Sequence, residues 1–138
     1  MIAAKLIGIV LIACFLFGRP AGAADAESNY LLHCAGCHLA DGSGVADKVP
    51  SLKANLGWLA AREEGRDYLA RVPGASQAPV SDAELADVIN WMLIEFGSVS
   101  ANQTDRLLSE DDVSTARVNV LADPELRRTE LWDRYSLE

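Results

Sequence analysis

Two cysteines and a histidine stand together early in the chain, in the order Cys34-Ala35-Gly36-Cys37-His38. Two thiols at this spacing, followed directly by an imidazole, form the sequence pattern that attaches a c-type haem. The thiols add across the two vinyl groups of the haem, and the imidazole then reaches the iron from one face. The pattern therefore predicts one covalently bound haem c, held through Cys34 and Cys37, with His38 as the proximal iron ligand.

Three other kinds of site also use closely spaced cysteines. A zinc site would need two further ligands, and the only other histidine is His33, next to Cys34. A redox-active dithiol usually lies in a βαβ setting, which this sequence does not indicate. A disulfide between Cys34 and Cys37 would leave His38 without a role. These alternatives stay open, and haem attachment is the interpretation that uses all three side chains.

The N-terminal segment has the layout of a secretory signal peptide. The apolar stretch Leu6–Phe17 follows a lysine, and Ala21-Gly22-Ala23 offers small residues for cleavage. The stretch is short for a membrane-spanning helix, which needs about 20 residues. We therefore expect residues 1–23 to be a signal peptide that exports the protein across the inner membrane of a bacterium to the periplasm. An uncleaved anchor and lipidation of Cys14 are the alternatives.

Loss of this segment would make an acidic chain more acidic. The 138 residues carry a net charge of −8, and residues 1–23 contain Lys5 and Arg19 but no acidic residue, so residues 24–138 carry −10. This charge argues against nucleic acid as a partner, because phosphate binding draws on Lys and Arg. Cys14 would leave as well, so that the remaining pair of cysteines makes a local site rather than a disulfide framework.

A second strong pattern predicts a helix from Val80 to Phe96. Ser81 and Glu84 have the spacing of a capping box, and Gly97 is a natural stopping residue. Apolar residues recur at helical spacing along one face of this segment, namely Leu85, Val88, Ile89, Met92 and Phe96. Between this helix and the cysteines, residues 54–71 predict two short helical pieces that are interrupted at Gly65.

Residues 24–97 resemble the class I monohaem cytochromes c. The resemblance is carried by residues 34–38, by Tyr30 four residues before them, by Asp-Gly-Ser-Gly at 41–44 and by Pro50. It implies an all-α class I cytochrome c fold wrapped around one covalent haem. It also implies that the Pro50 carbonyl accepts a hydrogen bond from His38 Nδ1 and fixes the ring. Finally, it implies that Trp91 is a haem-binding residue. Trp91 would lie where the first and last helices of the domain cross, and this crossing would also contain Ala26, Tyr30 and Val88.

The sequence departs from this family at the sixth iron ligand. Most class I cytochromes c supply a methionine from a loop before the last helix, but the corresponding residues 72–79 contain none. Met92 lies inside the predicted helix and suits core packing better than ligation. The distal ligand is therefore unknown, with water, no ligand, Ser76, Gln77, Lys53 or Asn55 as the alternatives. Without a thioether ligand, we expect a lower reduction potential and an iron open to NO, CO, cyanide or peroxide.

Two arginines before this loop are candidates to bind the haem propionates. Arg66 and Arg71 could each donate paired hydrogen bonds to a carboxylate, with Trp58 and Tyr68 packing nearby. The alternative is a solvated helix surface with i,i+4 ion pairs, which we prefer for Arg62.

Residues 98–138 form a C-terminal extension that the resemblance does not cover. Ser109-Glu110-Asp111-Asp112 opens one predicted helix, to about Leu121, and Asp123-Pro124-Glu125 opens another. We expect the two helices to dock on the haem domain and to bury Trp132, because solvated tails seldom carry an exposed tryptophan. The alternative is a partner-docking surface anchored by Trp132.

Together these patterns predict an exported electron carrier rather than an enzyme. Single electrons would pass through the exposed haem edge to redox partner proteins, which an acidic surface predicts to have a basic docking patch. The open distal site raises an alternative function, a haem protein that binds small ligands or acts as a peroxidase. We expect no membrane span after cleavage of the signal peptide, and the sequence leaves the oligomeric state undetermined.

Overall fold

The computed structural model describes residues 24–136, so the predicted signal peptide lies outside the described residues. Every named element in this part of the chain is a helix, and strand-like pairing there is limited to one isolated bridge between Val45 and Val49. The predicted all-α fold class is confirmed. None of the helices between residues 24 and 136 has the length and apolar character needed to cross a membrane.

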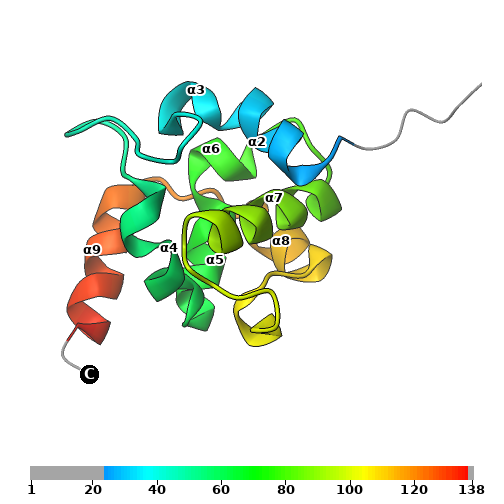
Figure 1. Ribbon diagram of the computed structural model, residues 1–138. Helices are drawn as coiled ribbons and strands as arrows, with labels where there is room; N and C mark the ends of the chain where they lie inside the picture. The colour runs from blue at the N-terminus through cyan, green and yellow to red at the C-terminus, as the bar shows by residue number, and fades with distance from the viewer. Residues whose placement is uncertain (1–23, 137–138) are drawn as a thin grey trace, which may run out of the picture.

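The helices follow one another through short connections, apart from the longer loop of residues 39–51 between α3 and α4 (Figure 1). In chain order they are α2 (Ala26–His33), α3 (Ala35–His38), α4 (Leu52–Ala60), α5 (Glu63–Arg71), α6 (Pro73–Ser76), α7 (Asp82–Glu95), the 3-10 helix η1 (Thr104–Arg106), α8 (Glu110–Arg117) and α9 (Pro124–Tyr135).

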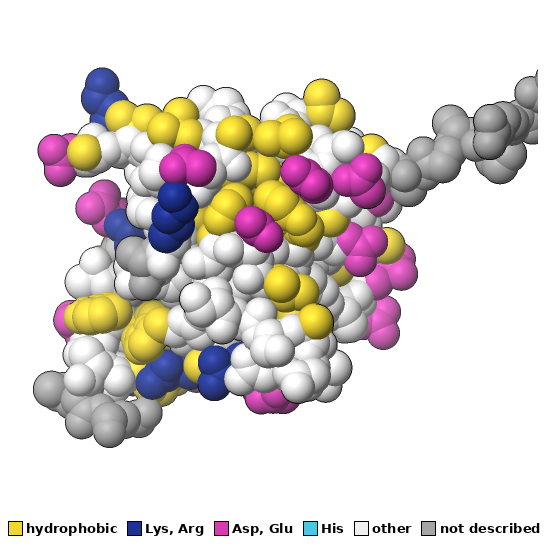
Figure 2. Space-filling view, viewed as in Figure 1, with side chains coloured by type: hydrophobic (Ala, Val, Ile, Leu, Met, Phe, Trp, Pro, Cys, Tyr) yellow, Lys and Arg dark blue, Asp and Glu magenta, His cyan; other side chains and the backbone are white. Residues whose placement is uncertain are grey.

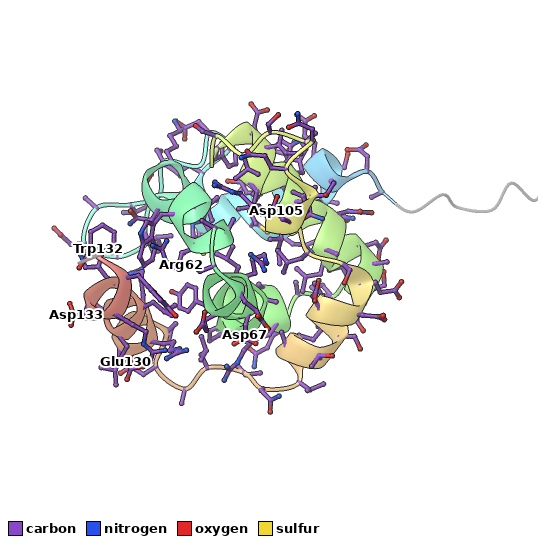
Figure 3. All side chains as sticks on the ribbon, turned by 90° about the horizontal axis from the view of Figure 1, so that it is seen from below. Arg62, Asp67, Asp105, Glu130, Trp132 and Asp133 are labelled. Carbon is purple, nitrogen blue, oxygen red and sulfur yellow. The ribbon has the colours of Figure 1, made fainter. Side chains whose placement is uncertain are left out.

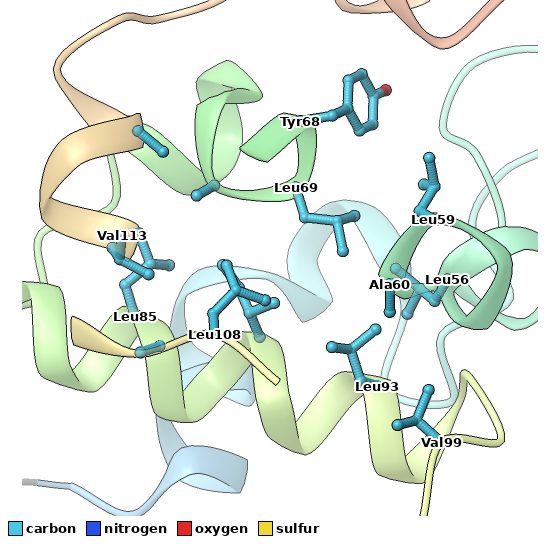
Figure 4. Packing of buried hydrophobic residues seen from close by; sticks show 14 of the residues in the cluster. Leu56, Leu59, Ala60, Tyr68, Leu69, Leu85, Leu93, Val99, Leu108 and Val113 are labelled. Atoms are coloured by element: carbon cyan, nitrogen blue, oxygen red, sulfur yellow. The ribbon is translucent and has the colours of Figure 1, made fainter. Parts of the chain in front are cut away.

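Helix α5 is the central helix of the fold. It contacts α4, α6, α7, α8 and α9. Two glutamates stand in its first turn and Arg71 in its last turn, which is the charge order that the helix dipole favours. Its buried residues Tyr68, Leu69 and Ala70 belong to a core that includes residues of α4 and α7 (Figure 4).

The boundary between α4 and α5 corrects the sequence-based expectation. The chain turns at residues 61–62, whereas Gly65, the expected interruption, is buried inside α5. A Cβ atom at Gly65 would overlap the carbonyl oxygen of Leu59. The glycine therefore allows two helices to approach closely and does not interrupt one.

Helix α7 confirms the expected capping box. The Ser81 hydroxyl accepts from the Glu84 amide, and a Glu84 carboxylate oxygen accepts from the Ser81 amide. The core face of the helix is buried at Leu85, Ala86, Val88, Ile89 and Leu93. At its other end, α7 approaches α4 so closely that a Cβ atom at Gly57 would overlap the Gly97 carbonyl.

The C-terminal extension shares the core of the preceding helices. Helix α8 packs against both α5 and α7, and α9 packs against α5. Six buried residues from the extension belong to the same apolar cluster as the residues of α4, α5 and α7 (Figure 4), namely Val99, Leu108, Val113, Ala116, Leu121 and Leu131. Burial of these side chains ties the extension to the fold through the hydrophobic effect.

The contact between α9 and α4 differs from the expectation for Trp132. Leu131 is the buried anchor at 1% exposure, whereas Trp132 stays 48% exposed and covers Trp58 with a ring-centroid distance of 5.0 Å. The Arg62 guanidinium lies 4.8 Å from the ring centroids of both Trp58 and Tyr135 (Figure 3 shows Arg62 and Trp132). Arg62 therefore joins two helices through cation–π contacts and is not part of a purely solvated face.

Asn90 fastens the start of the extension to α7. Its side-chain oxygen accepts from the Leu108 amide, and its side-chain nitrogen donates to the Leu108 carbonyl, each at 2.8 Å. Leu108 itself is 5% exposed. One amide side chain thus satisfies both backbone groups of a buried residue that has left regular helix.

We predict that Asn90→Ala destabilises the protein by about 1–3 kcal/mol, because it leaves a buried amide and a buried carbonyl without partners. Asn102→Ala is the control, since Asn102 is exposed in the turn before η1. Urea denaturation of both variants measures the free energies of unfolding. Equal stabilities would show that water replaces the Asn90 amide at no cost.

Candidate functional site

The cysteines and the histidine lie where α2 meets α3. Asp25 caps α2 by accepting a hydrogen bond from the Ser28 amide, and α2 ends at the exposed His33. Cys34 is the N-cap residue of α3, and His38 is the last residue of that one-turn helix. The helical turn places the two cysteines and the histidine of the pattern on a single short element.

The His38 ring is oriented by the chain that follows α3. His38 Nδ1 lies 3.1 Å from the carbonyl oxygen of Pro50, as the resemblance implied. Because a carbonyl can only accept, Nδ1 carries the proton and the Nε2 lone pair is left for a metal. Burial lowers the pKa of His38, and the hydrogen bond to Pro50 opposes part of that shift. The neutral ring that an iron ligand requires is therefore favoured.

The loop between His38 and Pro50 is shaped by Gly44. The Gly44 amide donates to the His38 carbonyl at 2.9 Å. Gly44 has a φ of +69°, and a Cβ atom there would overlap the carbonyl of Val49 and lie 2.7 Å from the carbonyl oxygen of Pro50. The loop can therefore return Pro50 to the histidine because this position has no side chain.

Tyr30 fastens the other side of α3 to the core. Its ring is fully buried, with centroids 5.1 Å from Trp91 and 5.4 Å from Phe96 of the α7 segment. Its hydroxyl donates to the Leu39 carbonyl at 2.6 Å. Burial raises the pKa of Tyr30, so the phenol stays protonated and remains a donor.

Leu39, directly after the histidine, has a strained backbone. Its φ of 63° and ψ of 159° lie in a region that residues other than glycine rarely adopt. Such a conformation costs on the order of 1–3 kcal/mol and persists where the surroundings determine it. Here the Tyr30 hydroxyl holds the Leu39 carbonyl, and the Leu39 amide donates to Ala35.

The side chains on α3 fit a c-type haem. Both thiols are free, Cys37 is exposed and Cys34 is partly buried. Burial raises the pKa of the Cys34 thiol, which keeps it uncharged. Two free thiols, with a neutral histidine whose Nε2 is available, are the donor set that thioether attachment and proximal ligation need. His38, Cys34 and Cys37 would hold the group.

The candidates for the sixth ligand lie on α4, at the end of α6 and on α7. Met92 packs against the apolar core from α7, Gln77 is exposed at the end of α6, and Asn55 is exposed on α4. The Lys53 ammonium pairs with Asp41 at 2.9 Å, and this hydrogen bond, more than any other contact, holds the pKa of Asp41 far below its usual range. Ser76 is buried, and its hydroxyl donates to the Val72 carbonyl.

The structure commits Arg66 and Arg71 to protein contacts. Arg66 donates to the Ala60 carbonyl at 2.8 Å. Arg71 donates to the Asn119 carbonyl and pairs with Asp67, so that it joins α5 to the chain after α8. These contacts use some of the donors of each guanidinium, and binding of the haem propionates by Arg66 and Arg71 stays a prediction.

Trp91 lies where the helix crossing was expected. Its ring packs against Tyr30 and Phe96 as α2 crosses α7. It also lines a shallow hollow that includes Ala40 and Asp41, which follow the histidine. Trp91 therefore lies next to the segment that follows α3.

Sequence reasoning missed two groups at this site. Tyr30 was predicted to make aromatic contacts at the helix crossing, without a role for its hydroxyl, although a buried phenol needs a hydrogen-bond partner. Gly44 was part of the glycine-rich stretch, but its specific contact with the Val49–Pro50 backbone depends on how the loop closes.

Comparison with known proteins also indicates a protein that binds haem c. No family model matches the sequence. The chain is 26% identical to cytochrome c-552 from one strain of Thermus thermophilus over 129 residues, which span 80% of this chain and 87% of that protein. It is 27% identical to a second T. thermophilus cytochrome c-552 over 116 residues, covering 71% of this chain and 88% of the relative. This distant similarity supports a c-type cytochrome.

The similarity reaches beyond residue 97. The longer match spans 80% of the chain, which is more than residues 1–97 can supply. It must therefore include part of the C-terminal extension.

We predict that Gly44→Ala destabilises the protein by about 1–3 kcal/mol, because alanine at this positive φ would overlap the Val49–Pro50 backbone. Gly36→Ala is the matched control inside the cysteine pattern, since a Cβ atom there meets nothing within 4 Å. Chemical denaturation gives the stabilities, and NMR of the His38 ring reports its environment. A variant at Gly44 with wild-type stability and an unchanged His38 ring would contradict this role for the glycine.

Proposed function

We propose that the protein is an exported monohaem cytochrome c that carries single electrons between redox partners of the periplasm. The observation that supports this best is the pattern of residues 34–38 on α3, with the His38 ring oriented by Pro50 at 3.1 Å. The similarity to cytochrome c-552 supports a haem-binding electron carrier in general terms. When bound, haem c supplies a one-electron couple between ferric and ferrous iron.

The residues around α3 have separate roles in this proposal. Cys34 and Cys37 would hold the haem covalently, and His38 would bind its iron through Nε2. Pro50 holds the His38 ring in one orientation, so that little reorganisation accompanies a change of charge at the iron. Tyr30 holds the chain after His38 against α7. A rigid site of this kind suits a carrier that must accept and release an electron without large movement.

The alternative function uses an open distal side of the haem. It is favoured by the sequence of residues 72–79, which contains no methionine, and by Met92, which packs against the core. We propose that the segment from α6 to the start of α7 borders this side, with Gln77 as a candidate weak ligand. An iron without a strong sixth ligand would bind CO, NO, cyanide or peroxide.

The distribution of charge supports a basic partner. Residues 24–47 and 72–105, which contain α2, α3 and α7, include no lysine or arginine. Acidic side chains gather on the α2 and α7 side of the molecule (Figure 2), and those on α2 and α7 are Glu27, Asp82, Glu84, Asp87 and Glu95. Opposite charges would speed the encounter with a basic docking patch and orient it.

Export follows from the predicted signal peptide of residues 1–23. Haem attachment through thioethers uses free thiols in an exported chain, and the close cysteine pair fits that setting. Cleavage after Ala23 would release the protein into the periplasm, whereas lipidation of Cys14 would anchor it to a membrane.

The first test is covalent haem on the purified protein. We predict that protein produced with a cytochrome c maturation system retains haem after denaturation, and that Cys34→Ser together with Cys37→Ser abolishes this. Cys14→Ser is the matched control and should keep the haem. A pyridine haemochrome spectrum of denatured protein makes the measurement. Loss of all colour from the wild-type protein on acid–acetone extraction would contradict the proposal.

The same preparation separates the two functions. High-spin ferric iron, and CO binding to the reduced protein, would support an open distal side. A sulfur-to-iron charge-transfer band would instead show that Met92 ligates the iron, and would exclude the open site. Peroxide turnover by an open site would favour the alternative function.

A second prediction concerns charge. We expect the reduced protein to react with hexaammineruthenium(III), a cation, at a rate that falls as salt is added, because salt screens attraction to the acidic face. Replacing Glu84 and Asp87 by Gln and Asn should lower this rate, whereas Glu130→Gln on α9 should not. Stopped-flow spectroscopy measures the rates. A rate that rises with salt would contradict an acidic docking face.

A further inference from the structure

Arg117, near the end of α8, binds the segment that joins α6 to α7. Its Nε donates to the Ser76 carbonyl at 3.2 Å, one terminal nitrogen donates to the Ala78 carbonyl at 2.9 Å, and the other donates to the Val80 carbonyl at 3.0 Å. The nitrogen that reaches Val80 also pairs with Asp82 at 2.7 Å. The guanidinium thus contacts every second residue of the segment from Ser76 to Asp82.

These contacts are partly shielded from water. The Arg117 side chain is 16% exposed and Ser76 is 7% exposed. Hydrogen bonds from a charged donor in such surroundings are stronger than those at an open surface. Only arginine has a planar fork with enough donors to serve three carbonyls and a carboxylate at once.

The bound segment has little regular structure of its own. Between α6 and the cap of α7, the backbone bonds are short-range, from the Gln77, Ala78 and Val80 amides to Pro73, Ala75 and Ala78. The Ser76 and Val80 carbonyls accept from Arg117, which lies 37–41 residues later in the chain than its three carbonyl partners, and the Ala78 carbonyl accepts from Arg117 in addition to the Val80 amide. The C-terminal extension therefore supplies the hydrogen bonds that fix this segment.

The composition of the segment suits the border of an apolar ligand. Residues 72–81 contain no charged side chain. Val72, Ala75 and Val80 are partly buried and pack against the core, while His38 approaches from the separate loop that ends at Pro50. The resemblance to class I cytochromes c, most of which supply the sixth iron ligand from the corresponding loop, implies under the proposed function that the α6–α7 segment borders the haem on the side away from His38.

We propose that Arg117 is a positioning residue that holds the α6–α7 segment over this face and thereby limits the access of small ligands to the iron. The inference rests on the proposed function and assigns a role to the C-terminal extension. Without Arg117, three carbonyls lose a charged donor, and the segment opens more often by local unfolding. Small ligands then reach the iron faster, and water reaches it more often.

The test uses the full-length holoprotein with three single substitutions. Arg117→Ala removes all four contacts. Arg117→Lys keeps a charge for Asp82 but cannot serve the three carbonyls together. Arg127→Ala is the matched control, because Arg127 lies in the same extension and pairs with Glu130 of its own helix. Stopped-flow mixing of ferric protein with imidazole gives the ligand-binding rate, and a redox titration gives the potential.

We expect Arg117→Ala to bind imidazole at least about tenfold faster, since each lost charged hydrogen bond favours the open segment, and to have a changed reduction potential. Arg117→Lys should be intermediate, and Arg127→Ala should match the wild-type protein. If Arg117→Ala does not fold, the imidazole-binding rate of Arg117→Lys is compared with that of Arg127→Ala. A faster rate in Arg117→Lys would then support the role of Arg117.

Two results would overturn the inference. Wild-type imidazole rates and potential in a folded Arg117 variant, even with a lower melting temperature, would show that the arginine only stabilises the fold. Absence of covalent haem from the wild-type protein would remove the proposed function and this inference with it. Normal haem content with unchanged rates would remove the inference alone.

Discussion

The arrangement around the histidine depends on the hydrogen bond of one buried phenol. Tyr30 is inaccessible to solvent, so its hydroxyl must find an acceptor inside the protein, and it finds the Leu39 carbonyl at 2.6 Å. That acceptor belongs to the residue immediately after His38, whose backbone is strained. The aromatic contacts of Tyr30 with Trp91 and Phe96 connect this hydrogen-bonded segment to α7. The position of the segment that contains His38 and Leu39 is thereby set by the crossing of α2 and α7, two helices that are far apart in the chain.

Local patterns in the sequence predicted the elements that local interactions build. The Ser81–Glu84 capping box and the apolar face of α7 were predicted because both depend on residues within one or two turns. The opening of α9 at Asp123-Pro124 was predicted for the same reason. The approach of His38 to Pro50 came from the family resemblance, and the structure has it at 3.1 Å.

The remaining features depend on residues that meet across long stretches of chain. Gly65 has the composition of a helix breaker, but the close approach of Leu59 gives it a place inside α5. Arg71 has the chemistry of a carboxylate ligand, but Asn119 and Asp67 engage it. Arg117 belongs to no sequence motif, because three of its four partners are carbonyl groups, which every residue has. Polar contacts with the backbone of a distant segment leave no recognisable sequence pattern, and such contacts fix both the extension and the α6–α7 segment.

The uneven distribution of charge described for α2, α3 and α7 has a consequence for the molecule as a whole. All the lysines and arginines of residues 24–136 lie outside residues 24–47 and 72–105, whereas acidic residues occur in both sets of segments. The protein therefore has an electric dipole moment, with its negative end on the side of α2 and α7 (Figure 2). In the field of a charged membrane or a large redox complex, a torque acts on such a dipole within a distance of about 10 Å at moderate ionic strength. The molecule would rotate before it touches anything, and the face that arrives first would be selected during diffusion.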